Sequence, residues 1–102
     1  MSNPSDELPD VKSIDRLIHE PVRLLIMANL YVADTADFIY LMNQLNLTFG
    51  NLSSHMSKLE EAGYINVEKE FQDKKPVTKL SLTDLGREAF EDYRQRMKHL
   101  FI

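Results

Sequence analysis

The spacing of apolar residues divides the chain into segments of helical and of alternating character. In the middle of the chain, apolar positions recur every three or four residues, with a break at residues 44–47. This spacing predicts two helices, 38–43 and 48–62, joined by a tight turn. Thr48 is a suitable N-cap because its hydroxyl can accept a free amide of the first turn. Gly63 suits the left-handed residue that ends a helix.

The N-terminal part of the chain predicts an arm and two helices. Residues 1–12 are largely polar, and we expect a disordered or loosely tethered arm there. Ser13 can cap a short helix, 14–19. Pro21 is tolerated in the first turn of the next helix, 21–30, whose Leu, Ile and Met residues indicate burial. The candidate caps of the following helix are Asp34 and Thr35.

After Gly63 the period changes from helical to alternating, which predicts two strands. The first strand covers residues 65–71 and the second covers 77–82, with the polar turn 72–76 between them. On the first strand, one face carries Ile65, Val67, Lys69 and Phe71. On the second, one face carries Thr78, Leu80 and Leu82. Two short strands directly after a helix-turn-helix form a wing.

The last segment, 83–102, predicts a long helix with an apolar stripe. Thr83 is its expected N-cap, and Asp84 stands favourably at the positive end of the helix dipole. Phe90, Tyr93, Met97 and Leu100 follow one another at steps of three, four and three residues, a spacing typical of the seam between two helices. We expect Leu85 and Ala89 to cover the domain's own core, whereas Phe90 can serve the core or a partner. The candidate dimer-interface residues are Phe90, Tyr93, Met97, Leu100 and Phe101.

These elements predict one mainly α domain with a small β-wing, a winged helix-turn-helix, followed by a long C-terminal helix for dimerisation. The 102 residues fit one small domain, and 43% hydrophobic content suffices for a core. The expected divisions are the arm 1–12, the winged helix-turn-helix 13–82 and the C-terminal helix 83–102. The sequence contains no cysteine, signal peptide or membrane-length apolar stretch, so we expect a cytoplasmic protein.

The polar face of the helix 48–62 is the most informative surface of the chain. Its side chains are short and neutral or basic, and its only acids, Glu60 and Glu61, lie in the last turn. A helix that enters a major groove needs small donors and acceptors near its N-terminus and no carboxylate toward the phosphates. His55 lies at the border of the buried stripe, where it can instead pack or bond to the backbone.

The formal net charge of −4 argues against a generally basic nucleic-acid coat. Much of the acid, however, lies in residues 1–20 and in the C-terminal helix, outside the surface considered above. Acidic proteins can still present a locally basic face. The charge therefore keeps a second hypothesis open, in which the domain binds a protein and not DNA.

The order of these segments resembles that of winged helix-turn-helix transcription regulators, and is most similar to small prokaryotic domains related to the MarR and ArsR families. Residues 19–26 are similar to the opening helix of ArsR-like proteins, and 52–65 to the recognition helix and its exit. The wing lysines and the turn 82–87 complete the resemblance, which covers roughly residues 14–93.

The resemblance implies DNA binding as a dimer. Asn51, Ser54, His55 and Lys58 match positions that face the groove, and the wing-tip lysines match positions where such proteins often carry arginine. Lysine neutralises phosphate but lacks the bidentate fork of arginine, so we expect backbone contacts from this wing and not base readout. The candidate DNA-contacting residues are Thr48, Gly50, Asn51, Ser53, Ser54, His55, Ser57, Lys58, Lys74 and Lys75.

No catalytic constellation or cofactor motif is present, so we expect no enzyme and no cofactor. His19 and His99 lack a metal-ligand spacing, and the cysteine sites of metal-sensing ArsR proteins are missing. The first hypothesis is a dimeric repressor that reads an inverted repeat in double-stranded DNA, with or without an unidentified small-molecule effector. The alternative is a winged-helix module for protein–protein interaction.

Overall fold

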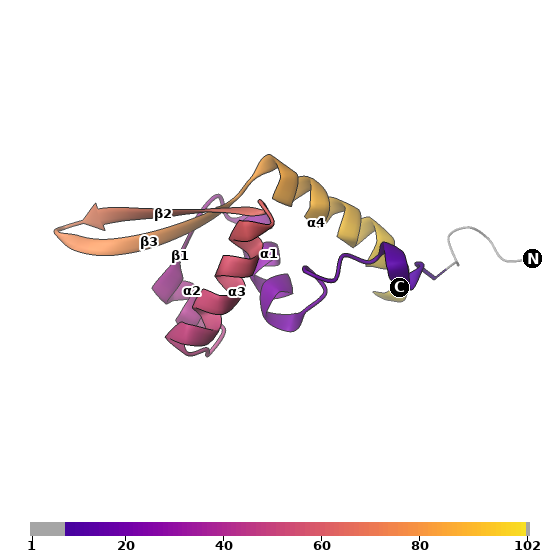
Figure 1. Ribbon diagram of the computed structural model, residues 1–102, viewed down its shortest axis with the longest axis horizontal. Helices are drawn as coiled ribbons and strands as arrows, with labels where there is room; N and C mark the ends of the chain where they lie inside the picture. The colour runs from indigo at the N-terminus through magenta and orange to yellow at the C-terminus, as the bar shows by residue number, and fades with distance from the viewer. Residues whose placement is uncertain (1–7, 102) are drawn as a thin grey trace, which may run out of the picture.

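The computed structural model describes residues 8–101 and confirms the winged helix architecture (Figure 1). In this part of the chain the α-helices are α1 (Pro21–Val32), α2 (Phe38–Gln44), α3 (Phe49–Glu61) and α4 (Asp84–Met97). The strands are β1 (Ala36–Asp37), β2 (Ile65–Gln72) and β3 (Lys75–Leu82), and two short 3-10 helices, η2 (Val11–Ser13) and η3 (Lys98–Phe101), lie near the ends. No helix in residues 8–101 is long and apolar enough to cross a membrane.

The helix-turn-helix consists of α2 and α3, and the predicted ends of α3 are confirmed. The Thr48 hydroxyl accepts a hydrogen bond from the Asn51 amide (3.2 Å), and Gly63 has a φ of +78°. Thr83 caps α4 in the same way, by accepting from the Gly86 amide (2.9 Å). These caps satisfy amides that have no partner within their own helix.

The predicted caps of α2, Asp34 and Thr35, are wrong. The chain first runs extended through β1, which pairs Ala36 with Leu80 of β3. Asp37 then caps α2 by accepting from the amides of Ile39 and Tyr40. The strand pairing, which the local sequence does not indicate, moves the cap to Asp37, two residues after Thr35, and the helix begins at Phe38 as predicted.

The predicted helix 14–19 is also absent. Asp10 caps η2, and the Ser13 hydroxyl donates to the Asp10 carbonyl instead of capping a helix. Asp15 accepts from the amides of Leu17 and Ile18 and so forms a turn. A short Asp side chain competes well with helical hydrogen bonds in this way. Of the predicted arm, residues 1–7 lie outside the described residues.

The antiparallel sheet has the order β1-β3-β2, and its register confirms the predicted faces of the wing. Ile65 pairs with Leu82 and Val67 with Leu80, so these residues share the core-facing side. The predicted five-residue turn shortens to Asp73 and Lys74, both at positive φ. That is the backbone of a tight two-residue hairpin, and β3 therefore already begins at Lys75.

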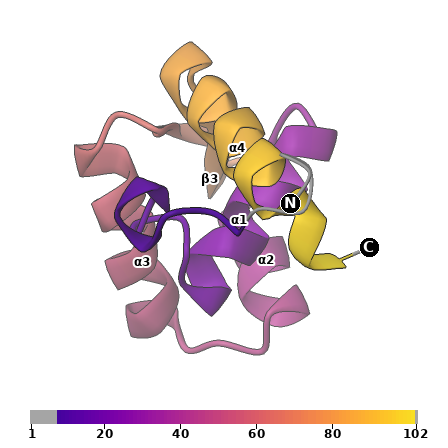
Figure 2. The same cartoon turned by 90° about the vertical axis from the view of Figure 1, so that its right-hand side faces the viewer.

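The hydrophobic core surrounds α1, which lies between α2, α3 and α4 (Figure 2). Its fully buried residues include Ile26, Met27 and Leu30 of α1, Leu52 and Leu59 of α3, and Leu80 of β3. Leu85 was expected in this core but is 54% exposed, because α4 turns that side of its first turn to solvent. The wing extends away from this helical body, on the side opposite the C-terminal end of α4 (Figure 1).

Candidate nucleic-acid interface

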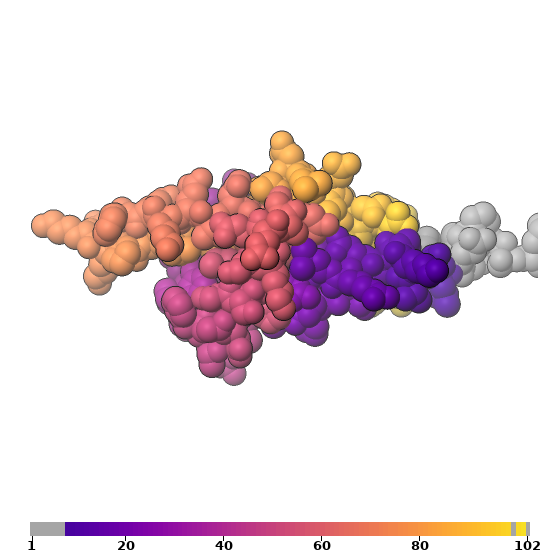
Figure 3. All heavy atoms as spheres, in the orientation of Figure 1, coloured from indigo at the N-terminus to yellow at the C-terminus, as the bar shows by residue number. Residues whose placement is uncertain are grey.

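Helix α3 presents an uncovered polar face next to the wing, as the space-filling view shows (Figure 3). Leu52 and Leu59 hold the opposite face in the core. The exposed residues are Thr48, Gly50, Asn51, Ser54, Ser57 and Lys58, whereas Ser53 and His55 are half-buried. The structure thus brings most of the predicted contact residues onto one surface, although it tests no contact with DNA.

Gly50 lies open in the first turn of α3. A Cβ built at this residue would meet no atom within 4 Å. Packing within the domain therefore does not require glycine here. The residue leaves the backbone of the helix N-terminus accessible to an approaching molecule.

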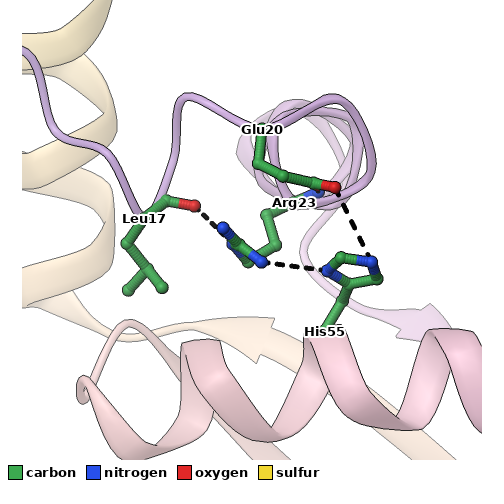
Figure 4. A network of polar contacts seen from close by, with 4 residues as sticks. All are labelled: Leu17, Glu20, Arg23 and His55. Carbon is green, nitrogen blue, oxygen red and sulfur yellow. Dashed lines mark hydrogen bonds and ion pairs between the residues drawn. The ribbon is translucent and has the colours of Figure 1, made fainter.

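The His55 ring lies against α1 (Figure 4). Its Nδ1 accepts a hydrogen bond from Nη1 of Arg23 (3.0 Å), and its Nε2 lies 3.7 Å from a carboxylate oxygen of Glu20. Because a guanidinium can only donate, neutral His55 carries its proton on Nε2, facing Glu20. The arrangement gives His55 a positioning role between α3 and α1, while its predicted contact with DNA stays a prediction.

Arg23 and Glu20 are functional-site neighbours that sequence reasoning did not identify. The Glu20 carboxylate caps α1 by accepting from the Arg23 amide (2.8 Å), and the Arg23 guanidinium also holds the Leu17 carbonyl. The acid before Pro21 signals a helix start. Nothing local, however, signals that Arg23 meets a histidine 32 residues away.

Phe49, the first residue of α3, was also not identified as a candidate. Its ring packs on Phe38 of α2 with centroids 4.9 Å apart, yet its side chain remains mostly exposed. The pair stiffens the turn between the two helices and leaves an apolar surface at the N-terminal end of α3.

The wing lysines lie at its tip. Lys74 is the second turn residue and Lys75 is the first residue of β3, and both are exposed beside Asp73. Lys79 forms an ion pair with Glu70 across the hairpin (3.6 Å) and is partly neutralised by it. Lys69, on the other face of the wing, is exposed and has Thr78 as its cross-strand partner.

Three of the five predicted dimer-interface residues are buried within the single chain. Phe90, Tyr93 and Met97 are only 5–7% exposed and belong to the core around α1. Phe101, which is 81% exposed, lines a groove with Leu24 of α1, and Leu100 is 44% exposed. The proposed partner contact, which the single chain does not test, therefore rests on Leu100, Phe101 and the adjoining face of α1.

Two tyrosines, the buried Tyr93 and the half-buried Tyr64, tie the N-terminal segment to the rest of the domain. Nδ1 of His19 hydrogen-bonds to the Tyr93 hydroxyl (2.8 Å), and burial raises the pKa of Tyr93. The Tyr64 hydroxyl donates to Asp15 (2.5 Å), and burial together with this hydrogen bond raises the pKa of Tyr64 to about 12. Both contacts support the packing behind α3 and lie away from its exposed face.

This arrangement defines a winged helix-turn-helix: a capped recognition helix with an exposed polar face, and a two-stranded wing beside it. Residues 22–101 match the family described as "Winged helix DNA-binding domain". An uncharacterized protein of Methanocaldococcus jannaschii is 38% identical over 78 residues, which are 76% of this chain and 85% of that protein. The chain belongs to the winged helix DNA-binding domain family.

Solved structures agree with this assignment. A transcriptional regulator homologue from Pyrococcus horikoshii superimposes with a TM-score of 0.78 and 34% identity, over 84% of this chain and 85% of the other. A mutant MarR from E. coli, solved in complex with operator DNA, has a TM-score of 0.63 and 22% identity, over 81% and 64% of the two chains. The resemblance expected from the sequence is confirmed, and the family and fold indicate a DNA-binding regulatory domain, a class that is typically non-enzymatic.

Proposed function

We propose that the protein is a sequence-specific transcriptional repressor that binds an inverted repeat as a homodimer. Each subunit places α3 in a major groove, and the wing rests on the adjoining phosphates. A two-fold dimer reads half-sites about one helical turn apart, ~34 Å. Occupation of such a site blocks transcription from an overlapping promoter. We place the protein in the cytoplasm of a prokaryotic cell, where it has access to the DNA.

The exposed, acid-free N-terminal part of α3 is the observation that carries this proposal. It combines short donors and acceptors, such as Asn51 and Ser54, with the positive end of the helix dipole. These groups suit base edges and phosphates. The chain's net charge of −4 does not oppose this contact locally, because the nearest acids on α3 are Glu60 and Glu61 at its other end.

Selection from the organism's own genomic DNA tests the proposal. The purified protein is incubated with a fragmented genomic pool at two salt concentrations, and the retained fragments are sequenced. We expect enrichment of an inverted repeat that survives the higher salt. Retention without a shared motif, lost at the higher salt, would reduce the function to non-specific binding. No retention in either buffer would favour the protein-interaction module instead.

Two single lysine variants distinguish a DNA contact made by α3 from a general effect of positive charge. Lys58→Ala should weaken binding to the selected repeat about tenfold and lower the slope of log affinity against log salt by about one, because one phosphate contact is lost. Lys12→Ala is the matched control, since Lys12 is exposed in η2 at the end of the molecule opposite the wing. Equal binding by both folded variants would contradict the proposed groove contact.

A further inference from the structure

The tip of the wing exposes an aromatic ring that the proposed phosphate contacts do not use. Phe71 is 78% exposed, and its cross-strand partner is Pro76, also exposed. The pair directly follows the pair Gln72–Lys75 that flanks the two-residue turn. It therefore occupies a non-hydrogen-bonded site, where facing side chains approach closely and the missing amide of proline breaks no ladder bond.

The two faces of the wing differ in charge. Glu68 and Glu70 lie on the face opposite Phe71, where Glu70 meets Lys79. The face of Phe71 carries Lys69 and Thr78 further in, and no carboxylate between the core and the turn. Lys74 lies in the turn at the tip, and Lys75, the partner of Gln72, lies on the face of Glu70. Between the core and the turn, where Asp73 lies, a polyanion can approach the face of Phe71 without meeting an acid, and Lys69 complements its charge.

The hairpin carries the ring away from the helical body, most of the distance to a second groove. The third strand of the sheet, β1, pairs with β3 only at Leu80 and Lys79, so β2 and β3 extend as a two-stranded hairpin beyond these residues. Four residues separate Leu80 from Pro76, which is about 13 Å of strand. The minor groove beside an occupied major groove is half a helical turn away, roughly 17 Å. The tight turn keeps the tip narrow.

We infer that Phe71, backed by Pro76, is an apolar wedge that enters a base step of the minor groove next to the major groove occupied by α3. This inference rests on the proposed function and deepens it. The ring unstacks the step and bends the duplex, while Lys69 on the same face and Lys74 in the turn hold neighbouring phosphates. Pyrimidine–purine steps unstack most easily, so the wedge selects such a step at a position that α3 does not touch.

The test uses the full chain and a duplex that carries the repeat recovered from the genomic pool. 2-Aminopurine replaces one base at the step half a turn outside each half-site, and fluorescent dyes on the two ends report bending. With the wild-type protein we expect increased 2-aminopurine fluorescence and a shorter end-to-end distance. Phe71→Ala should remove both signals at saturating protein and weaken binding about tenfold. Phe71→Leu keeps an apolar wedge and should retain most of both signals.

Thermal unfolding shows whether the variants are folded. We expect unchanged unfolding midpoints, because the Phe71 ring is exposed. Wild-type binding with no change in 2-aminopurine fluorescence, or with the same change in Phe71→Ala, overturns the wedge but leaves the proposed function intact. Failure of the wild type to retain any DNA overturns both. Dissociation of a dimer by Phe71→Ala in the absence of DNA assigns the ring to a second copy of the chain and also overturns the wedge.

Discussion

Gly86, in the first turn of α4, must be glycine because it lies in close contact with the backbone that leads into β2. A Cβ at this residue would lie 1.9 Å from the Tyr64 carbonyl oxygen, a backbone atom that cannot move away like a side-chain tip. The Thr83 amide donates to that same carbonyl (3.1 Å), which locks the exit of α3 to the start of α4. A single missing side chain thus allows the first turn of α4 to pack against the segment that joins α3 to β2.

Replacement of the two helical glycines should therefore have opposite effects. We expect Gly86→Ala to lower the free energy of unfolding by about 1–3 kcal/mol, because overpacking against backbone outweighs the helix propensity of alanine. Gly50→Ala should leave it unchanged or raise it by up to about 1 kcal/mol, since its Cβ meets open space. Urea unfolding midpoints measure both, and equal midpoints for the two variants would contradict the steric account.

At the scale of elements, α3 is held in place by a polar clamp as well as by its buried leucines. His55 of α3 accepts from Arg23 of α1, and Arg23 also holds the Leu17 carbonyl of the preceding turn. The clamp joins three segments behind the exposed face, and the His55 side chain is only 20% exposed. This geometry makes His55 important for the orientation of the recognition helix.

We predict that His55→Ala destabilises the domain by about 1.5–3 kcal/mol, because a half-buried guanidinium loses its hydrogen-bond acceptor. DNA binding by the folded fraction at low temperature should fall less than it does for Lys58→Ala. Urea unfolding and titration of the selected repeat give the two numbers. A variant with wild-type stability and a larger loss of affinity than Lys58→Ala would show that the ring contacts DNA directly.

At the scale of the whole molecule, the proposed dimer requires an apolar surface on which a second subunit can dock. The stripe of α4 already packs on α1, so the remaining apolar surface adjoins Leu24 and Leu25 and the C-terminal Leu100 and Phe101. A groove of about 410 Å³ lies between Leu24 and Phe101. This surface lies at the other end of the molecule from the wing, as a dimer with two outward-facing wings requires.

Phe101→Asp tests this surface, because a charge there cannot be buried against an apolar partner without a large desolvation penalty. The residue is 81% exposed in the single chain, so the domain should fold normally. Sedimentation at micromolar concentration should shift from dimer to monomer, and affinity for the complete inverted repeat should fall toward that for a single half-site. A wild-type protein that sediments as a monomer would remove the two-fold operator hypothesis altogether.

The sequence by itself determined the features whose causes are local. The side chains of Thr48 and Thr83 cap the N-termini of α3 and α4, and Gly63, at positive φ, ends α3. The alternation in β2 and β3 sets the faces of the wing. The absence of acids from the first turns of α3 is likewise a property of the sequence alone. These features were sufficient to predict the winged helix class and most of the exposed recognition surface.

Only the tertiary structure decided where long-range contacts cap a helix, form a turn or bury a side chain. The cap of α2 depends on the pairing of β1 with β3, and the turn at Asp15 replaces a predicted helix where Tyr64 reaches it. Phe90, Tyr93 and Met97 became core residues because α1 lies beneath them, and His55 faces inward because Arg23 meets it. Each of these outcomes requires contact between residues far apart in the sequence, which local periodicity cannot specify.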